Sequence, residues 1–224
     1  MIVSEDEVQR IYRKRFPDKA LASKSRTWKV IVDHFLSKWI DPGDTVLDLG
    51  CGYGEFLNHV RAAHRIGVDI NPDSPMHLEK GIEFYQKGVC DLSFLSDDAI
   101  DIVFTSNLME HLPGKREVEQ MVREAYRVLK PGGHFVMMGP NIRALPGAYW
   151  DFWDHIVPIS DRSLSELLEN MDFDVVDLVP RFLPYTTRTW IPKHPLLVQL
   201  YLKVPLAWRI MGKQFLIRAR KPER

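Results

Sequence analysis

The stretch TVLDLGCGYGEF, residues 45–56, combines acidic residues with a glycine-rich turn. Its glycines follow an apolar run, and Phe56, Leu57 and Val60 then recur at helical spacing, which predicts strand, turn and helix. Such a turn lets a ligand approach the backbone and faces it with a helix N-terminus. Asp48 stands near the end of the predicted strand, where a buried carboxylate is costly unless a cation compensates it.

A cationic ligand suits this turn better than a phosphate. A phosphate loop needs a Lys and then Ser or Thr after its last glycine, whereas Glu55 and Phe56 follow Gly54. In the dinucleotide fingerprint the third glycine comes one residue later than it does here. Residues 39–60 contain no Lys or Arg, and two carboxylates flank the loop. This setting favours an ammonium or a sulfonium.

Two more acidic residues follow later apolar runs. Asp69 is the last residue but one of the run HRIGVDI, about 20 residues after the first glycine, where a carboxylate can accept hydrogen bonds from both hydroxyls of a ribose. Asp91 follows a weaker run at residues 82–87. Asp48, Asp69 and Asp91 therefore end three successive predicted strands, and each could meet a different polar part of one ligand.

The pattern D-x-G-x-G-x-G, which starts at Asp48, resembles motif I of class I S-adenosylmethionine-dependent methyltransferases. The LKPGG sequence and the apolar run after it, residues 129–138, are also similar to this family, and the resemblance extends over residues 28–221. It implies a Rossmann-like fold that binds S-adenosylmethionine (SAM) and releases S-adenosylhomocysteine (SAH), in an enzyme of the small-molecule or glycan-pathway type.

The same resemblance implies roles for single residues. Asp91 would bind the adenine amino group, the backbone of Leu92 a ring nitrogen, and Ile70 would flank the adenine. The full set of predicted cofactor-binding residues is Asp48, Gly50, Cys51, Gly52, Gly54, Phe56, Asp69, Ile70, Asp91, Leu92 and Asn107.

Glu110, His111 and His155 are the candidate catalytic residues. Methyl transfer needs mainly orientation, because the donor carries its own leaving group, and a base helps when the acceptor is a hydroxyl. Glu110 and His111 follow the fourth predicted strand. Three roles are open for them there: a base, a contact to the substrate or part of a structural loop. His155 ends the segment AYWDFWDH, which suits an acceptor pocket or an aromatic plug over the sheet edge. Asp151 or Asp154 would orient the His155 imidazole.

The spacing of Asn107, Glu110 and His111 resembles that of metal-binding methyltransferases that act on a catechol-like or terminal ribose hydroxyl. Those enzymes have Glu at the first position, where this chain has Asn107, so no metal is predicted. Amino-methylating enzymes of nucleic acids often carry N/D-P-P-Y/F/W after the fourth strand. Residues 106–109 read SNLM instead, which favours an oxygen acceptor.

The remaining chain supplies the elements that position these residues. Strand patterns occur at 46–49, 64–70, 82–87, 100–105, 134–138, 173–178 and 214–219. Helical spacing at 27–40 and 115–129, and a capping box of Ser163 and Glu166, predict helices between and before them. This alternation predicts an α/β fold with a seven-stranded, mostly parallel sheet. The resemblance implies the order 3-2-1-4-5-7-6 with the seventh strand antiparallel.

A chain of 224 residues suits a single domain. The expected parts are N-terminal cofactor-covering helices (1–40), a core (41–181), a helical insertion (182–212) and a last strand with a tail (213–224). In the first part, residues 4–16 predict a helix and 17–25 a link, and three side chains touch the cofactor or pack: Tyr12, Arg26 and Trp28.

Composition limits the function classes. Lys and Arg equal Asp and Glu at 30 each, so the whole chain lacks the charge of a nucleic-acid-binding protein. Cys51 and Cys90 fit no disulfide framework or metal pattern. The charged N-terminal sequence shows no signal peptide, and a cytoplasmic enzyme is expected.

Residues 195–212 are apolar but interrupted by polar residues and a proline, too broken to span a bilayer. They lie in a membrane interface, cover the core or pack against a second subunit. Similar bacterial methyltransferases often serve glycan or lipid-linked pathways, so the expected reaction is O-methylation of a small-molecule, saccharide or lipid-linked acceptor.

Three alternatives remain at this point. The chain could be an RNA methyltransferase that uses its basic segment at 10–29, which would bind RNA in a salt-dependent way. It could also be a non-catalytic SAM-binding subunit that holds a partner through residues 195–212. A nicotinamide oxidoreductase shares the fold, but the early third glycine argues against it.

Overall fold

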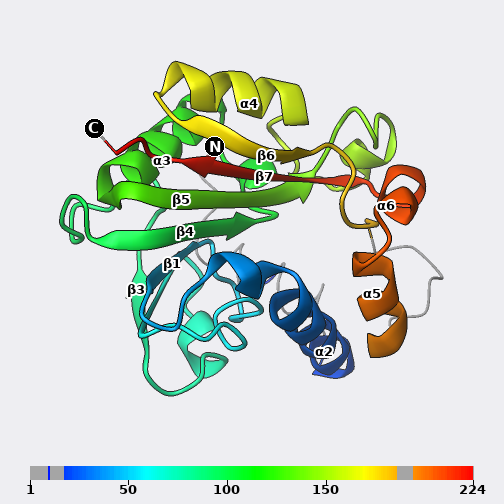
Figure 1. Ribbon diagram of the computed structural model, residues 1–224, viewed down its shortest axis with the longest axis horizontal. Helices are drawn as coiled ribbons and strands as arrows, with labels where there is room; N and C mark the ends of the chain where they lie inside the picture. The colour runs from blue at the N-terminus through cyan, green and yellow to red at the C-terminus, as the bar shows by residue number, and fades with distance from the viewer. Residues whose placement is uncertain (1–9, 11–17, 186–193, 224) are drawn as a thin grey trace.

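The computed structural model describes residues 10, 18–185 and 194–223, and within them seven strands form one sheet (Figure 1). The strands are β1 (Thr45–Leu49), β2 (His64–Asp69), β3 (Ile82–Gln86), β4 (Ile100–Ser106), β5 (Leu129–Pro140), β6 (Asp174–Val179) and β7 (Gln214–Arg220). Their order is β3-β2-β1-β4-β5-β7-β6, and β7 runs antiparallel to both of its neighbours. The predicted α/β class, strand order and antiparallel last strand are confirmed.

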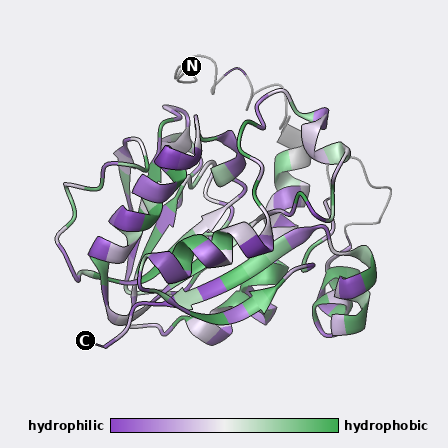
Figure 2. Cartoon of the chain, turned by 90° about the horizontal axis from the view of Figure 1, so that it is seen from above, coloured by the Kyte–Doolittle hydropathy of each residue, from purple (hydrophilic) through white to green (hydrophobic). Residues whose placement is uncertain are grey.

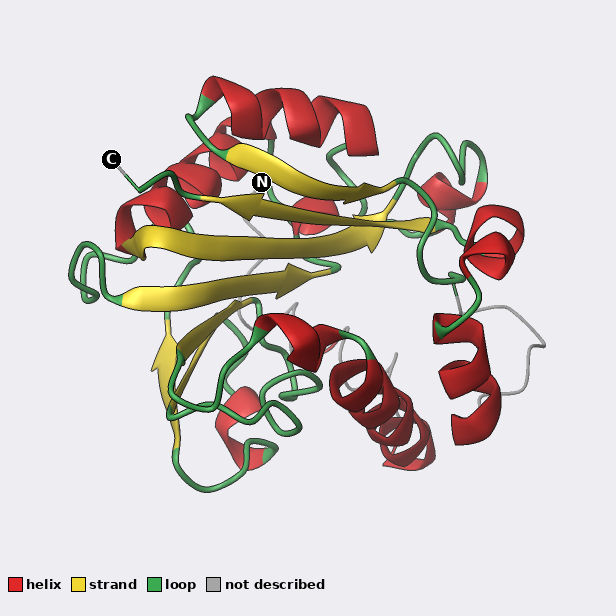
Figure 3. Cartoon of the chain, viewed as in Figure 1, coloured by secondary structure: helices red, strands yellow, loops and turns green. Residues whose placement is uncertain are grey.

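The helices lie on both sides of this sheet (Figure 3). They are α2 (Asp18–His34), α3 (Lys115–Val128), α4 (Asp161–Asn170), α5 (Pro195–Leu202) and α6 (Pro205–Met211), with 3-10 turns η1 (Leu36–Trp39), η2 (Ser74–Met76), η3 (Met109–His111) and η4 (Ala148–Asp151). The predicted helix at 4–16, and with it Tyr12, lies outside the described residues.

Alternation along the strands divides the core into two hydrophobic clusters. Leu47 and Leu49 of β1 face the side where α3 and α4 pack. Val46 faces the other side, together with residues of α2, η1 and α5. Asp48 has the parity of Val46 and therefore points to the α2 side of the sheet. Figure 2 shows hydrophobic residues gathered on the strands of the sheet.

Two predicted boundaries in the helical parts were wrong. Residues 18–25, predicted as a link, belong to α2, which packs beside α5 (Figure 1). Helix α4 begins after Ser160, whose hydroxyl accepts from the backbone N–H of Ser163 at 3.0 Å. The capping box therefore pairs Ser160 with Ser163, not Ser163 with Glu166, because Ser can replace Glu as the reciprocal partner.

The helix predicted after the glycine turn is also absent, since residues 52–59 form consecutive turns. Gly54 has φ +78°, which interrupts a right-handed helix. The Asn58 side chain donates to the backbone carbonyl of His77 at 2.9 Å and accepts from the N–H of Glu79 at 2.9 Å. Such side-chain bonds compete with helical ones, so the segment is held to the loop after η2.

Residues 195–212 both cover the core and expose apolar surface. Leu202 is buried, and Val198, Tyr201 and Trp208 pack against the cluster on the α2 side. The opposite side of α5 and α6 is exposed. Among the described residues, no helix is long and apolar enough to cross a membrane.

Candidate functional site

The glycine turn lies at the carboxyl ends of β1 and β4, where ligands bind in open α/β sheets. The N–H of Gly50 donates to the carbonyl of Val68 at 2.8 Å, which joins the turn to β2. Gly50 has φ +72°, and a Cβ atom there would lie 2.8 Å from Leu108 Cδ1. The turn therefore presents bare backbone against the loop that follows β4.

Asp48 is buried, and its pKa is raised well above the usual value, first by burial and then by the charges of Glu55 and Asp69. Glu55 forms an ion pair with Lys24 of α2 at 2.7 Å. Three carboxylates thus gather beside one backbone turn. A positively charged ligand would lower the cost of this grouping, so the site fits a sulfonium.

The Asp69 carboxylate, at the end of β2, is tied to the turn by the backbone. One of its oxygens accepts from the N–H of Gly52 at 2.7 Å and the other from the N–H of Asn71 at 2.8 Å. Burial raises its pKa. A carboxylate has about four acceptor positions, so the group retains capacity for a ribose hydroxyl. The structure brings Asp69 to the glycine turn, as the sequence predicts.

The side chains of Cys51 and Phe56 point into the core, away from the surface of the glycine turn. Phe56 is buried and stacks on Phe104 of β4, with ring centroids 4.0 Å apart. The Cys51 thiol packs against Gly67 of β2, and burial raises its pKa. Both side chains belong to the core, so only their backbones can line the turn.

The three residues predicted to contact the adenine, Ile70, Asp91 and Leu92, differ in exposure and in hydrogen bonding. Ile70 is half-buried just past β2. Asp91 is exposed, and hydrogen bonds from Ser93 lower its pKa. The N–H of Leu92 donates to Glu124 Oε2 at 3.0 Å. In this structure that donor is engaged within the protein, and an adenine nitrogen would have to displace Glu124.

Asn107 has φ +53° directly after β4, a backbone conformation that Asn tolerates better than most residues. Its N–H donates to the carbonyl of Met138 at 3.0 Å, and its side-chain amide donates to Ser106 Oγ at 2.8 Å. The left-handed residue turns the chain from β4 into η3, which carries Glu110 and His111.

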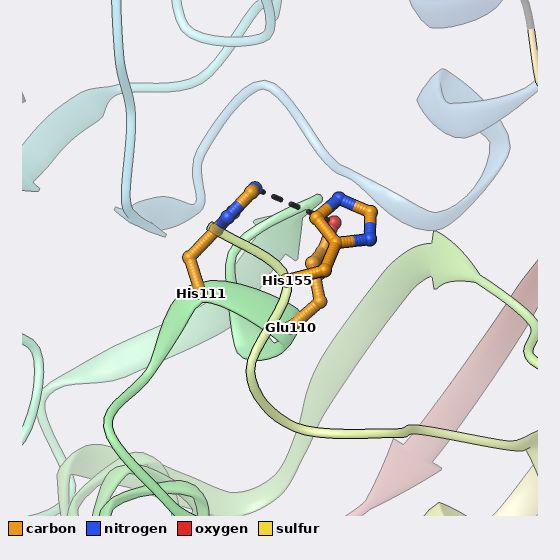
Figure 4. A group of neighbouring side chains, drawn as sticks. All are labelled: Glu110, His111 and His155. Carbon is orange, nitrogen blue, oxygen red and sulfur yellow. Dashed lines mark ion pairs between the residues drawn. The ribbon is translucent and has the colours of Figure 1, made fainter. Parts of the chain in front are cut away.

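Glu110, His111 and His155 converge from η3 and from the segment that follows η4 (Figure 4). One ligand atom of each lies within 4.8 Å of the others. Glu110 and His155 are buried, with 2% and 5% of their surface exposed, and His111 is partly open. The two imidazoles meet edge to face with centroids 4.9 Å apart. The structure therefore brings all three candidate catalytic residues together.

The aspartate that orients a histidine here is Asp154, but its partner is His111. His111 Nδ1 lies 2.9 Å from the Asp154 carbonyl and 3.3 Å from its carboxylate. The sequence analysis had paired Asp154 with His155, and the structure shows a contact with His111. His155 instead stacks on Phe152, with centroids 5.0 Å apart, and its Nε2 lies 3.4 Å from the Tyr185 hydroxyl.

The aromatic segment serves as a plug and leaves exposed rings outside it. Tyr149 is fully buried; its hydroxyl donates to the carbonyl of Val157 and accepts from the N–H of Ile159. Trp153, by contrast, is 97% exposed. Tyr149 fixes the segment, and His155 is the residue of this segment that reaches the cluster.

The sequence profile of a family described as "Methyltransferase domain" matches residues 22–178 of this chain. That span covers every part of the glycine turn, the three strand-end acids and the cluster of Glu110, His111 and His155. The chain belongs to this methyltransferase family. The recognition of a class I SAM-dependent methyltransferase is thereby confirmed.

Curated relatives share part of their length with this chain. A probable SAM-dependent methyltransferase of Mycolicibacterium smegmatis is 32% identical over 62% of this chain and 56% of the relative. A fatty-acid O-methyltransferase of the same organism is 29% identical over 68% of this chain and 60% of its own length. Other relatives are named as an N-methyltransferase and a hydroquinone methyltransferase. The chain spans about half the length of such relatives.

Among solved structures, a SAM-dependent methyltransferase from Archaeoglobus fulgidus shares the fold. Its TM-score is 0.67 at 22% identity, over 94% of this chain and 98% of the other. At this identity the likeness concerns the fold alone.

Four contacts at the site involve residues to which the sequence analysis gave no role or another role. Lys24 pairs with Glu55, Glu124 accepts from Leu92, Asp154 contacts His111 and Tyr185 lies by His155. Only Asp154 carried a signal, because it stands beside His155 in an aromatic and acidic run. The other three depend on contacts between distant segments.

Proposed function

We propose that this chain transfers the methyl group of SAM to an oxygen atom of a small-molecule, saccharide or lipid-linked acceptor. The observation that supports an oxygen acceptor is the Glu110–His111–His155 cluster, in which Glu110 lies four residues beyond the end of β4. Bound SAM supplies an electrophilic methyl group on a positively charged sulfur. The chain's own residues must hold that cation, aim the acceptor and take up the acceptor's proton.

Cofactor binding in this proposal is the task of the β1 and β2 ends. Asp48 and Glu55 provide negative charge beside the bare turn at Gly50. Asp69 accepts from the ribose hydroxyls while its bonds to the turn keep its carboxylate in place. The adenine roles of Ile70, Asp91 and Leu92 remain proposals that require the Glu124 contact of Leu92 to open.

The acceptor's proton moves to His111 Nε2 in this proposal. The Asp154 carbonyl can only accept a hydrogen bond, so His111 carries its proton on Nδ1 and leaves Nε2 free to act as a base. Glu110 Oε1 lies 3.8 Å from Nε2 and stabilises the imidazolium that forms. His155 and the rings around it supply the wall against which the acceptor packs.

Two measurements test this proposal. Calorimetry should show SAH binding to the wild-type chain, and Asp69→Ala should weaken it about 10–100-fold, the value expected for hydrogen bonds to a charged group. Asp172→Asn, on the exposed turn after α4, is the matched control and should leave the affinity unchanged. Failure of wild-type protein to bind SAH would overturn the cofactor assignment.

To identify the acceptor, the protein is incubated with SAM that carries a labelled methyl group and with lipid or aqueous fractions of a cell extract. Label should enter a compound as an O-methyl group and depend on His111. Label on nitrogen would refute the oxygen assignment, and SAH binding without any transfer would indicate a non-catalytic subunit.

We further propose that the α5–α6 surface contacts a membrane. We define this surface by the exposed apolar side chains Leu196, Leu197, Leu200, Val204, Leu206 and Ile210. Its largest exposures are 69% at Ile210 and 67% at Leu196. Residues 194–213 contain no Asp or Glu, while Lys203 and Arg209 are exposed among the apolar residues. Apolar area with basic residues suits an interface with anionic lipid.

Vesicle flotation distinguishes the membrane from a second copy of the chain. Wild-type protein should float with vesicles that contain phosphatidylglycerol and less with pure phosphatidylcholine, and Leu206→Asp should abolish flotation. Val176→Asp, an exposed apolar residue on β6, is the control. Dimerisation lost in Leu206→Asp, without flotation of the wild type, would show that the surface joins two subunits instead.

A further inference from the structure

The Glu110–His111–His155 cluster has the composition of a metal centre. We propose that these three side chains bind one divalent transition-metal ion at the acceptor end of the site. Within the part of the chain that the structure describes, the donor atoms of these three residues lie close enough to one another to hold an ion. The sequence predicted no metal because Asn107 stands where metal-binding enzymes have Glu. The fold brings a donor from another segment, His155.

The orientation of His111 supports this proposal. The Asp154 carbonyl accepts from Nδ1 at 2.9 Å and the carboxylate of the same residue lies at 3.3 Å. This contact fixes the tautomer, so the lone pair of Nε2 points away from Asp154, on the side where Glu110 Oε1 lies at 3.8 Å. A carboxylate or carbonyl behind the ring is the usual support for a metal-binding histidine.

Glu110 and His155 are fixed relative to each other by the backbone. The N–H groups of Ile156 and Val157 both donate to the Glu110 carbonyl, at 2.7 and 3.1 Å. The imidazole of His155 lies between Phe152 and Tyr149, with centroids 5.0 and 4.9 Å away. Two ligands from distant segments are thus held before any ion binds, which reduces the ordering cost of binding.

The donor set selects the class of ion. Two imidazoles and one carboxylate suit zinc, iron or cobalt, whereas Mg²⁺ and Ca²⁺ prefer oxygen ligands. Zn–N bonds of about 2.0–2.1 Å place ligand atoms roughly 3.4 Å apart in a tetrahedron. The present separations are up to 4.8 Å, so the side chains must move towards one another when an ion binds. Three protein ligands leave a further position for the acceptor hydroxyl.

This inference deepens the proposed function, because a bound cation would lower the pKa of the acceptor hydroxyl and orient its oxygen. The buried Glu110 carboxylate would then balance the charge of the ion instead of an imidazolium. Metal binding itself depends on neither SAM nor the acceptor. It can therefore be tested separately from methyl transfer.

The experiment uses the full, untagged chain after chelation and desalting. Titration with Co²⁺ followed by visible absorption, and with Zn²⁺ by calorimetry, should show one site per chain. Mg²⁺ should not compete at equal concentration. Pulsed electron paramagnetic resonance of the Cu²⁺-loaded protein should show two histidine nitrogens.

Variants locate the site. Glu110→Gln, His111→Ala and His155→Ala should each weaken Zn²⁺ binding at least 100-fold, and Asp154→Asn about 10–100-fold through its support of His111. His64→Ala, at the opposite end of β2, is the matched control and should bind as the wild type does. SAH affinity reports that each variant is folded.

Absence of a stoichiometric site in the wild type, or equal binding by all three ligand variants, would overturn the proposal. If the metal fails to bind while O-methylation continues, the proposed function stands with His111 as the base. If the metal binds and no methyl transfer occurs, the proposed function fails instead.

Discussion

On the cofactor side of the site, the acidic residues Asp48 and Glu55 lie within a few positions of each other and of the glycine turn. On the acceptor side, Glu110 and His155 come from segments separated by α3 and β5. The acidic residues of the cofactor side belong to one local sequence motif. The residues of the acceptor side come together only when the sheet forms. Substitutions should therefore act on cofactor binding and on the acceptor side separately.

The largest effect is expected from Gly50→Ala. The added methyl group would lie 2.8 Å from Leu108 Cδ1 at φ +72°, so the Leu108 side chain must yield or the turn must move. A displacement of about 1 Å at such a site costs roughly 100-fold, and SAH affinity measured by calorimetry should fall by about that factor.

Gly81→Ala is its matched control. Gly81 has φ +84°, but nothing lies within 4 Å of the added atom. It should carry a similar backbone penalty of about 1–2 kcal/mol in thermal unfolding and keep its SAH affinity. Equal loss of affinity in both variants would mean that strain, not the close approach of Gly50, explains the effect.

An intermediate effect is expected from Asp48→Asn. Because burial raises the pKa of Asp48, the folded chain keeps a proton that the unfolded chain releases above pH 4 or so, and stability falls as the pH rises towards the raised pKa. Asn removes this penalty. The ligand-free variant should melt about 2–4 °C above the wild type at pH 8, and the gain should shrink towards pH 4.

The same variant should lower the affinity for SAM more than for SAH, because only SAM carries the sulfonium charge. A constant gain in melting temperature across this pH range, or an unchanged ratio of the two affinities, would contradict the electrostatic role of Asp48.

The smallest effect should come from Tyr149→Phe on the acceptor side. The hydroxyl bonds to Val157 and Ile159, and loss of such bonds costs about 1–3 kcal/mol in thermal unfolding. SAH affinity should stay within twofold of the wild type, while Zn²⁺ binding weakens by no more than about tenfold. A large loss of SAH affinity would show that the two sides are not separate.

Much of the fold could be predicted from the sequence, because strands with apolar runs carry strong local signals. The helix after the glycine turn could not, since Phe56, Leu57 and Val60 have helical spacing for a different reason. They fill the core from a series of turns that Gly54 and the Asn58 side chain hold. The spacing of these apolar residues predicts that they are buried, but it does not predict the hydrogen bonds that determine the backbone conformation.

For the candidate site, the sequence predicted which residues take part better than it predicted their contacts. The sequence named all of Glu110, His111 and His155, but it could not bring them together or assign Asp154 to His111. It also gave Leu92 a free N–H, which Glu124 occupies. Such pairings depend on which loops meet at the edge of the sheet, and a single sequence has no pattern for them.

Helix α2 has polar contacts with both the glycine turn and α5. Through Lys24 it holds Glu55, and through Ser25, whose hydroxyl lies 3.0 Å from His59 Nε2, it meets the segment after the turn. At its other end His34 Nδ1 lies 3.4 Å from the Gln199 side chain of α5. A shift of α5 would therefore be transmitted through α2 to the glycine turn. Substitutions in α2 should consequently be pleiotropic, altering the position of α5 and donor retention in the same mutant.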